Sequence, residues 1–290
     1  MSAGRKPVCR RLFTSCSTGE IFLPIAPHEV EIIILGSGGS PGVPMPACDC
    51  AVCRSEVPEN RRTRCSILLS YHGRNLLIDT ATDLRQQVLR EKINHIDAVL
   101  YTHTHADHVH GIDDLRPFNH RQQQLIPLYG SASAMEHLRR VFPYIFDPAI
   151  KLGYRPRLET RILEKPEDIL GLPVIPIPLR HGDDEATGYR VGPFAYLTDC
   201  SEIPAASRGL LRGLDLLILD GLRLRPHPTH FHVAAAVAEA RRIGARRTLL
   251  THLNHEIDHH RHESELPPGV GFAYDGQRLT FSLADQEHAP

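Results

Sequence analysis

The feature that most constrains this sequence is that one predicted strand after another ends in a residue able to bind a metal ion. Short apolar runs of strand character recur along the chain. The residues that close them are Asp79, His103, His181, Asp199, Asp220 and His252. Strand ends converge along one rim of a packed sheet structure. The sequence therefore predicts a site rich in histidine and aspartate along such a rim.

The densest of these strand ends is the stretch THTHADHVHG at residues 102–111, directly after the apolar run at residues 97–101. Side chains two residues apart in extended chain point to the same side, so His103 and His105 can face one ion. A helical turn after them would swing Asp107 and His108 toward a second position. Imidazole and carboxylate ligands suit Zn²⁺, Mn²⁺ or Fe²⁺. With 19 histidines in the chain, a solvated surface cluster is the alternative, and the spacing after a buried strand disfavours it.

A second group of metal-capable residues is a cluster of cysteines. The chain has seven cysteines, an odd number, and Cys48, Cys50 and Cys53 lie within six residues. This pattern favours metal binding in a reducing compartment, such as the cytoplasm, over a disulfide framework. A tetrahedral structural zinc site needs one more ligand. His255 lies three residues after His252, so it can reach a different ion from the one that His252 faces. The alternative is that the three cysteines are free buried thiols.

Composition limits the remaining possibilities. A chain of 290 residues with net charge −1 and 41% hydrophobic residues predicts one large α/β domain, which we place at residues 30–290. The neutral charge argues against a nucleic-acid partner. The chain has no apolar run of about 18 residues, so we expect no membrane-spanning helix. Residues 1–29 are basic and contain no acidic residue before Glu20. We expect a flexible extension there, with an organelle-targeting segment as the alternative.

The hydrophobic pattern also predicts particular elements. We expect helices at residues 82–91, 131–141 and 232–243, and an irregular proline-rich segment at residues 143–170. Prolines between Val174 and Leu179 indicate an edge strand, and residues 272–274 and 279–283 suggest a closing hairpin. The glycine-rich loop at residues 36–42 lacks the Lys-Ser/Thr of a phosphate-binding P-loop, so we expect a tight turn beside the site.

At this point the sequence resembles the metallo-β-lactamase-fold hydrolases. Residues 103–108 match the H-x-H-x-D-H motif of that family, and His181, Asp199 and His252 follow in the expected order. The resemblance covers about residues 31–283 and implies a four-layer αββα sandwich with two catalytic divalent ions, Zn²⁺ or Mn²⁺. It implies two sets of ligands bridged by Asp199: His103, His105 and His181 for one ion, and Asp107, His108 and His252 for the other.

The cysteine cluster narrows the resemblance to phosphoribosyl 1,2-cyclic phosphate phosphodiesterases. Their structural zinc ligands match four residues here: Cys48, Cys50, Cys53 and His255. The pyrroloquinoline quinone biosynthesis B proteins share the C-x-C-x-x-C spacing. One departure is that Asp220-Gly-Leu-Arg223 stands where those phosphodiesterases have a catalytic histidine. His230, just ahead of the alanine-rich helix, resembles the substrate-phosphate histidine of the ribonuclease Z branch.

These matches predict roles for individual residues. Asp107 or Asp199 would orient a water molecule shared by the two ions. Such ions lower the pKa of a bound water to about 7, and the resulting hydroxide would attack the substrate. His230 would protonate the leaving oxygen or bind a phosphate oxygen, and Arg223 or Arg225 would add positive charge. Asp79 would hold a ligand imidazole or bond to a turn.

The function that we expect is that of a dinuclear metal-dependent phosphodiesterase. Its substrate would be a small phosphate ester such as a cyclic ribose phosphate or a nucleotide. The alternatives are a tRNA 3′-processing nuclease of ribonuclease Z type, a pyrroloquinoline quinone biosynthesis B-like protein, or a β-lactam or thioester hydrolase. The nuclease usually needs a protruding basic arm, which we do not find in the sequence. A homodimer is left open.

Overall fold

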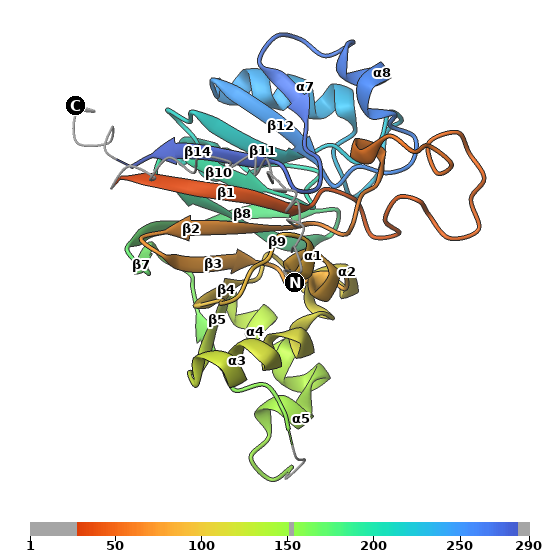
Figure 1. Ribbon diagram of the computed structural model, residues 1–290. Helices are drawn as coiled ribbons and strands as arrows, with labels where there is room; N and C mark the ends of the chain where they lie inside the picture. Colours follow the sequence, from red (N-terminus) through yellow and green to blue (C-terminus); the bar gives the residue numbers. More distant parts are fainter. Residues whose placement is uncertain (1–27, 151–153, 284–290) are drawn as a thin grey trace, which may run out of the picture.

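The protein is described by a computed structural model covering residues 28–150 and 154–283. Most of the predicted extension at residues 1–29 lies outside these residues. Two seven-stranded sheets form the centre of the molecule (Figure 1). In spatial order, the first sheet contains β14 (Arg278–Ser282), β1 (Glu29–Gly36), β2 (Ser66–Tyr71), β3 (Arg74–Ile78), β4 (Ala98–Leu100), β5 (Ile126–Gly130) and β6 (Leu158–Ile162).

The second sheet pairs the later strands and faces the first. In spatial order it contains β13 (Val270–Phe272), β12 (Arg247–Thr251), β11 (Leu216–Asp220), β10 (Phe194–Leu197), β9 (Asp184–Val191), β8 (Leu172–His181) and β7 (Glu167–Ile169). The cluster of buried side chains between the two sheets draws on both of them, including Ile32 and Ile34 from β1 and Phe194 and Tyr196 from β10.

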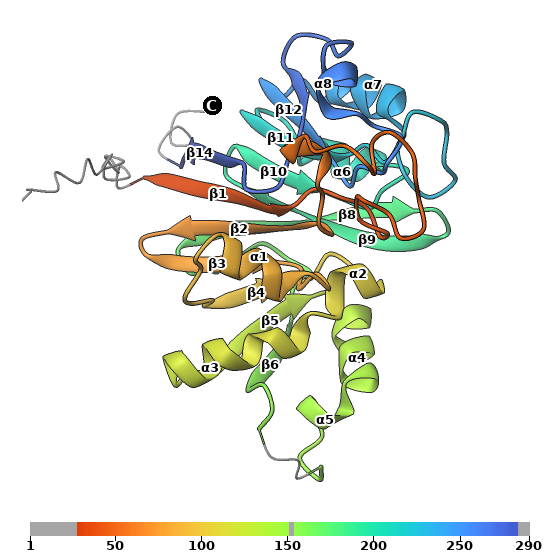
Figure 2. The ribbon, with the colours of Figure 1, turned by 45° about the vertical axis from the view of Figure 1, so that its right-hand side comes forward.

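Helices cover the two outer faces of the sheet pair. The first sheet is covered by α1 (Leu84–Arg90), α2 (Ala106–Val109), α3 (Arg116–Gln122), α4 (Ala132–Val141) and α5 (Pro143–Phe146), together with the 3-10 turn η2 (Ile112–Leu115). The second sheet is covered by α6 (Ala205–Gly209), α7 (Val233–Ile243) and α8 (His259–Glu263). Figure 2 shows α3 to α5 and α7 to α8 at opposite ends of the molecule. The predicted four-layer αββα sandwich is confirmed.

Strand β1 shows how the sequence creates these layers. Ile32 and Ile34 point into the cluster between the sheets, whereas Ile33 and Leu35 pack toward the helices. Successive side chains of a strand alternate between its two faces. The run at residues 32–35, which is apolar at every position, therefore suits a sheet buried on both sides.

The helices predicted at residues 82–91, 131–141 and 232–243 are confirmed as α1, α4 and α7. Ser131 caps α4, because its Oγ accepts a hydrogen bond of 3.2 Å from the backbone N–H of Ala134. This side-chain acceptor satisfies one of the free N–H groups of the first helical turn. The start of α4 was thus readable from local sequence.

The prediction of an irregular segment at residues 143–170 is wrong. Helix α5 and strands β6 and β7 lie within it. Strand β6 pairs with β5 in parallel, and β7 pairs with β8 in antiparallel fashion. These short strands depend on partners from elsewhere in the fold, and local composition does not encode such pairing.

The edge position predicted for Val174–Leu179 is correct only in part. Strand β7 is the edge strand, but it pairs only with residues 172–174 of β8. Pro176 and Pro178 lie beyond its end, and on the other side they pair with β9. Proline lacks an N–H group, so it is tolerated where a strand has an open side. The prolines therefore mark the uncovered half of β8.

The predicted closing hairpin at residues 272–274 and 279–283 is also wrong. Phe272 ends β13, which runs parallel to β12 in the second sheet. Leu279 belongs to β14, which runs antiparallel to β1 in the first sheet. The chain thus crosses between sheets where the sequence suggests a simple turn. No helix among the described residues has the length and apolar character needed to cross a bilayer.

Gly36, at the end of β1, tests the close approach of the glycine loop to its neighbours. A Cβ atom there would lie 1.9 Å from the backbone oxygen of Arg64. Replacing Gly36 with alanine is expected to lower the free energy of unfolding by about 3 kcal/mol, as overpacking does. Urea denaturation measures the free energy of unfolding of the variant and of wild type. The control Gly209→Ala, with nothing within 4 Å, should stay within about 1 kcal/mol of wild type.

Candidate metal centre

Sheet topology brings the metal-capable strand ends to one edge of the molecule. Strands β10, β11 and β12 run parallel, so the residues at or just after their ends emerge at the same edge: Asp199, Asp220 and His252. Strands β3 and β4 also run parallel and deliver Asp79 and the histidine motif from the opposite sheet. The edge thus gathers side chains from both sheets.

The histidine motif divides into two parts at the start of α2. His105 is the extended residue before that helix, which spans Ala106–Val109, and the ring of His103 lies 4.6 Å from the ring of His105. The helical turn directs Asp107 and His108 elsewhere, as the spacing predicts. The first ligand group combines the two histidines with residues from the second sheet. Its potential ligand atoms all lie within 4.8 Å of one another, and they belong to His103, His105, His181 and Asp199.

The remaining motif residues form a second group with His252. The ligand atoms of Asp107, His108 and His252 also lie within 4.8 Å of one another. Asp107 Oδ2 lies 3.4 Å from His108 Nε2 and 3.6 Å from His252 Nε2. Both sets of residues that the family resemblance implies are therefore brought together.

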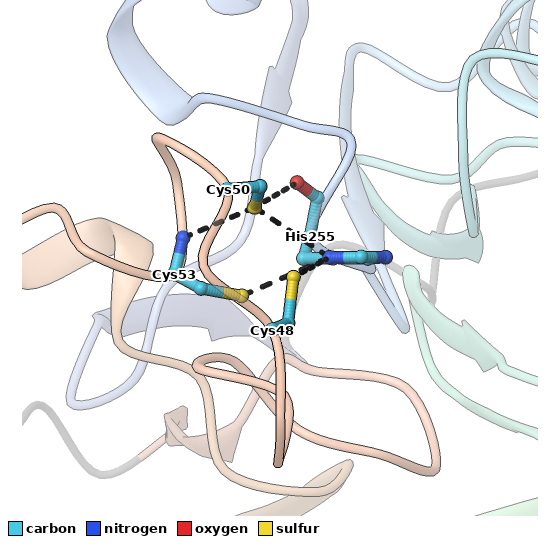
Figure 3. A group of neighbouring side chains, drawn as sticks. All are labelled: Cys48, Cys50, Cys53 and His255. Atoms are coloured by element: carbon cyan, nitrogen blue, oxygen red, sulfur yellow. Dashed lines mark hydrogen bonds between the residues drawn. The ribbon is translucent and has the colours of Figure 1, made fainter.

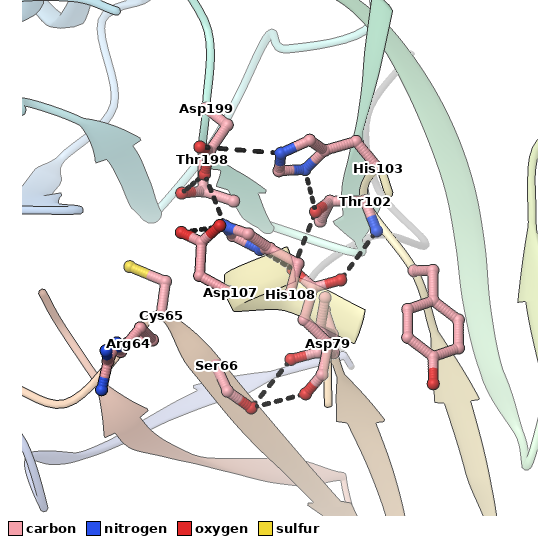
Figure 4. A network of polar contacts seen from close by, with 12 residues as sticks. Arg64, Cys65, Ser66, Asp79, Thr102, His103, Asp107, His108, Thr198 and Asp199 are labelled. Carbon is pink, nitrogen blue, oxygen red and sulfur yellow. Dashed lines mark hydrogen bonds and ion pairs between the residues drawn. The ribbon is translucent and has the colours of Figure 1, made fainter. Parts of the chain in front are cut away.

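Asp199 lies between the two groups. Its Oδ2 is 3.2 Å from His108 Nε2, and its Oδ1 is 3.2 Å from His252 Nε2. The same Oδ1 lies 3.8 Å from His103 Nε2 in the first group. Figure 4 shows Asp199 facing His103 and His108. One carboxylate thus offers an oxygen toward each group.

The chemistry of these side chains fits divalent metal ions. The Nε2 atoms of His103, His108 and His252 are buried and have no hydrogen-bond partner among the described residues. Buried nitrogens without partners are rare and call for a ligand or an ion. Two ligands that share a tetrahedral zinc lie about 3.3 Å apart, close to the separations around Asp199. The residues present therefore fit the metal ions that the fold family implies.

Asp79 supports the centre from behind. Its Oδ2 accepts hydrogen bonds of 2.7 Å from His108 Nδ1 and from Thr102 Oγ1, and its Oδ1 accepts one from the backbone N–H of Thr102. Burial raises the pKa of this carboxyl, although these donors act in the opposite direction. With Nδ1 of His108 engaged, Nε2 faces the centre. Asp79 thus plays both roles considered for it, bonding to a turn and to an imidazole.

The backbone at this edge is strained. Asp79, Asp199 and His252 have φ angles of 64°, 53° and 61°, in the left-handed region that residues other than glycine seldom adopt. Asp79 and His252 follow directly after a strand, and Asp199 follows one residue later. Such strain is maintained only where the surroundings determine the conformation, and it concentrates at functional sites.

The charge state of the carboxylates follows from their neighbours. Burial alone would raise the pKa of Asp107, but the nearby imidazoles of His108 and His252 hold it well below its usual range. Asp199 is fully buried, and the same two imidazoles together with His103 likewise keep its pKa low. Both groups are therefore ionised and able to bind cations.

His230 lies beside the second group, as the sequence predicts. Its ring stacks on that of His252 at a centroid distance of 4.7 Å. Its Nδ1 donates a 2.7 Å hydrogen bond to Asp220 Oδ2, which also accepts from the backbone N–H of Cys200. The sequence analysis missed this orienting role of Asp220. The available signal was an aspartate at a strand end with no assigned ligand partner.

Arg223, the predicted substrate ligand, engages its own loop. It donates to the carbonyl oxygens of Arg225 at 3.1 Å and Pro226 at 2.7 Å. Arg225 pairs with Glu256 at 2.6 Å. The structure therefore does not direct these two guanidinium groups into the centre, and a substrate contact for Arg223 stays a prediction.

The cysteine cluster meets His255, as the sequence predicts (Figure 3). The Sγ atoms of Cys48, Cys50 and Cys53 lie 3.1, 3.6 and 3.7 Å from His255 Nδ1. The backbone N–H of Cys53 donates to Cys50 and, despite partial burial, lowers the pKa of that thiol to about 6. Burial raises the pKa of Cys53 to about 11. Three sulfurs and one imidazole form the ligand set of a closed zinc site.

Replacing Asp79 with asparagine tests its support of the centre. The amide keeps the size of the side chain but cannot accept hydrogen bonds at both of its ends, so His108 loses its fixed orientation. We expect the affinity for the catalytic metal ions to fall by about 10–100-fold. Metal content after dialysis against a competing chelator measures this affinity. The control is Asp168→Asn, the same change at an exposed position. Equal metal retention by both variants would contradict the role.

Comparison with known proteins agrees with this geometry. A family model described as "Beta-lactamase superfamily domain" matches residues 74–253. The chain is 38% identical over 259 residues to an octanoyltransferase from Porphyromonas gingivalis; the match covers 85% of this chain but only 51% of that protein. It is 29% identical over 231 residues to a coenzyme PQQ synthesis protein B from Methylobacterium radiotolerans, covering 66% and 73% of the two chains.

Solved structures show the same fold. A diphosphatase from the PhnP family superposes with a TM-score of 0.83 at 43% identity, covering 88% of this chain and 98% of that one. Zinc-bound PqqB from Methylobacterium extorquens has a TM-score of 0.70 at 23% identity, covering 86% and 99%. At that identity the likeness concerns the fold alone. The chain belongs to the beta-lactamase superfamily, and it is a metal-dependent hydrolase with the metallo-β-lactamase fold.

Proposed function

We propose that this hydrolase is a dinuclear metal-dependent phosphodiesterase that acts on a small phosphate ester, such as a cyclic ribose phosphate or a nucleotide. The observation that carries the proposal is the arrangement of two ligand groups on either side of Asp199, with the His230–Asp220 pair beside them. The 43% identity to a diphosphatase of the PhnP family supports phosphate chemistry.

We assign two divalent ions, Zn²⁺ or Mn²⁺, to the centre and one structural Zn²⁺ to the cysteines. His103, His105 and His181 would hold one catalytic ion, and Asp199 would bridge to the other, which Asp107, His108 and His252 would hold. When bound, such a pair polarises a phosphoryl oxygen and lowers the pKa of water. The structural ion would belong to the site formed by Cys48, Cys50, Cys53 and His255.

The side chains of the centre then have separate tasks. The ionised carboxylates of Asp107 and Asp199 accept hydrogen bonds and so orient the attacking water. Asp220 fixes the Nδ1 of His230 as the hydrogen-bond donor, which leaves Nε2 for the substrate. When the ring is in its doubly protonated imidazolium form, that nitrogen carries a proton, which can bond to a phosphate oxygen or pass to the leaving oxygen.

The surroundings favour a small substrate. Beside His103 is a cavity of about 300 Å³, lined by polar side chains that include Thr104, His137 and Arg140. This volume lies at the lower end of the range for small-molecule sites. A net charge of −1 gives the chain no overall positive charge to attract RNA, which weighs against a tRNA nuclease.

The similarity to an octanoyltransferase does not favour acyl transfer. The chain spans only 51% of that protein, whose name describes the whole of it. The similarity to coenzyme PQQ synthesis protein B extends over 66% of this chain. The complete set of histidine and aspartate ligands around Asp199 favours a working hydrolase over a protein that only binds.

His105→Ala tests the proposed metal centre. This residue is exposed and lies in the first ligand group, so its loss should affect metal binding more than folding. Hydrolysis of bis(p-nitrophenyl) phosphate with added Mn²⁺ or Zn²⁺ should fall by more than the ~100-fold that loss of an outer partner costs. The control His120→Ala should retain turnover. Full activity of His105→Ala with unchanged metal content would overturn the assignment.

His230→Ala tests the proton donor by the choice of leaving group. A p-nitrophenolate leaves without protonation, whereas an alkoxide needs a proton in the transition state. We expect kcat for an alkyl phosphodiester to fall by about 100-fold or more, and kcat for bis(p-nitrophenyl) phosphate to fall far less. Equal losses for both substrates would mean that His230 only binds phosphate.

A further inference from the structure

Arg62 is a buried cation outside the ligand groups. Its side chain is 2% exposed and is among the largest fully buried side chains of the protein. Burial lowers the pKa of its guanidinium to about 10, so it stays charged at neutral pH. The negative charges of Asp275 and Asp258 favour its charged form, but the hydrogen bonds of the guanidinium go to other groups. Burying a charge is costly, and these contacts therefore need an explanation.

One contact of Arg62 is made with the turn that joins the two metal sites. Its Nη1 donates a 3.0 Å hydrogen bond to the backbone oxygen of Asn254. Asn254 lies between His252 of the catalytic centre and His255 of the cysteine site. Three residues of extended chain span at most about 10–11 Å, so the turn keeps the two histidines close to each other.

The other contact of Arg62 reaches the loop after the cysteines. Its Nη2 donates at 3.2 Å to Oδ1 of Asn60, which also accepts the backbone N–H of His259. The Nδ2 of Asn60 donates to Ser55 Oγ at 3.1 Å and to Asp258 Oδ2 at 3.0 Å. Asn60 thus ties the chain just after Cys53 to the segment that follows His255.

The backbone of Arg62 fixes the chain ahead of the cysteines as well. Arg62 and Val43 exchange two backbone hydrogen bonds, of 2.8 and 2.9 Å. The turn itself is held on other sides by Leu253, which donates to the oxygen of Ser37, and by Asn254, which donates to the oxygen of Leu222. Arg62 is therefore the point at which the cysteine loop and the 252–255 turn meet.

We propose that Arg62 is a positioning residue that links the cysteine site to the catalytic centre through the 252–255 turn. This inference rests on the proposed function, because it requires metal ions at both sites. An ion held by the cysteines would fix His255. The guanidinium fixes Asn254 against the same loop, and together they hold His252 in its strained conformation, with φ of 61°, facing Asp199.

The experiment compares Arg62→Met with the exposed neighbour Arg61→Met in the full chain. After cobalt substitution, the thiolate charge-transfer band reports on the cysteine site, and chelator competition measures affinity at the catalytic centre without any substrate. Arg62→Met should retain the charge-transfer band but bind catalytic ions about 10–100-fold more weakly, as loss of outer support does. Arg61→Met should match wild type in both measurements.

A conservative variant separates positioning from general stability. Arg62→Lys keeps the charge but reaches only one of the two acceptors, so it should restore part of the lost affinity. With a phosphodiester substrate, Arg62→Met should lower kcat more than it changes KM. Circular dichroism and thermal unfolding establish that each variant folds. If Arg62→Met does not fold, the same measurements on Arg62→Lys decide the question. Its affinity for catalytic ions should lie between that of wild type and the value predicted for Arg62→Met.

The link itself is tested by a double-mutant cycle with Cys50→Ser, which removes one ligand of the cysteine site. Both changes act through one turn, so Cys50→Ser should also weaken metal binding at the catalytic centre. The double variant should bind catalytic ions as tightly as the single variant with the lower affinity. Wild-type catalytic affinity in Arg62→Met, or losses that multiply in the double variant, would overturn the proposal. Metal affinity needs no turnover, so a wrong choice of substrate leaves the test valid.

Discussion

The structure depends on the attraction between one buried carboxylate and the imidazoles around it. Asp199 is fully buried at the seam of two sheets, where an isolated charge would be strongly disfavoured. Three imidazole nitrogens, those of His103, His108 and His252, lie 3.2–3.8 Å from its oxygens, and none of the three has a hydrogen-bond partner among the described residues. The cluster is therefore suited to hold cations between its members, and much of the surrounding fold serves to keep it in place.

That support comes from several directions. Asp79, at the end of β3, orients His108 from the first sheet, and the carbonyl oxygen of Thr229 orients His181 from the second. Asp220 orients His230. Because the supports lie in both sheets, the centre is complete only when the sheets pack together. This explains why strained backbone is maintained there: packing of two large layers determines the conformation of a few residues at their edge.

The sequence predicted what depends on local pattern. Apolar runs ending in aspartate or histidine gave the strand ends, H-x-H-x-D-H spacing gave the division of ligands at α2, and Ser131 gave the start of α4. It failed where partners are distant. The strands in the proline-rich segment and the separation of β13 from β14 follow from contacts made only in the folded chain.

By itself the sequence determined which chemical groups are present, and in what spacing: imidazoles and carboxylates at strand ends, and three thiols with a histidine to join them. Only tertiary structure decided which side chains hold those groups in position. Asp220 behind His230, and Arg62 beneath the turn between His252 and His255, act over separations of 10 and 192 residues. A hydrogen bond from a side chain to another part of the chain depends on where the two backbones are placed, and sheet packing decides that placement.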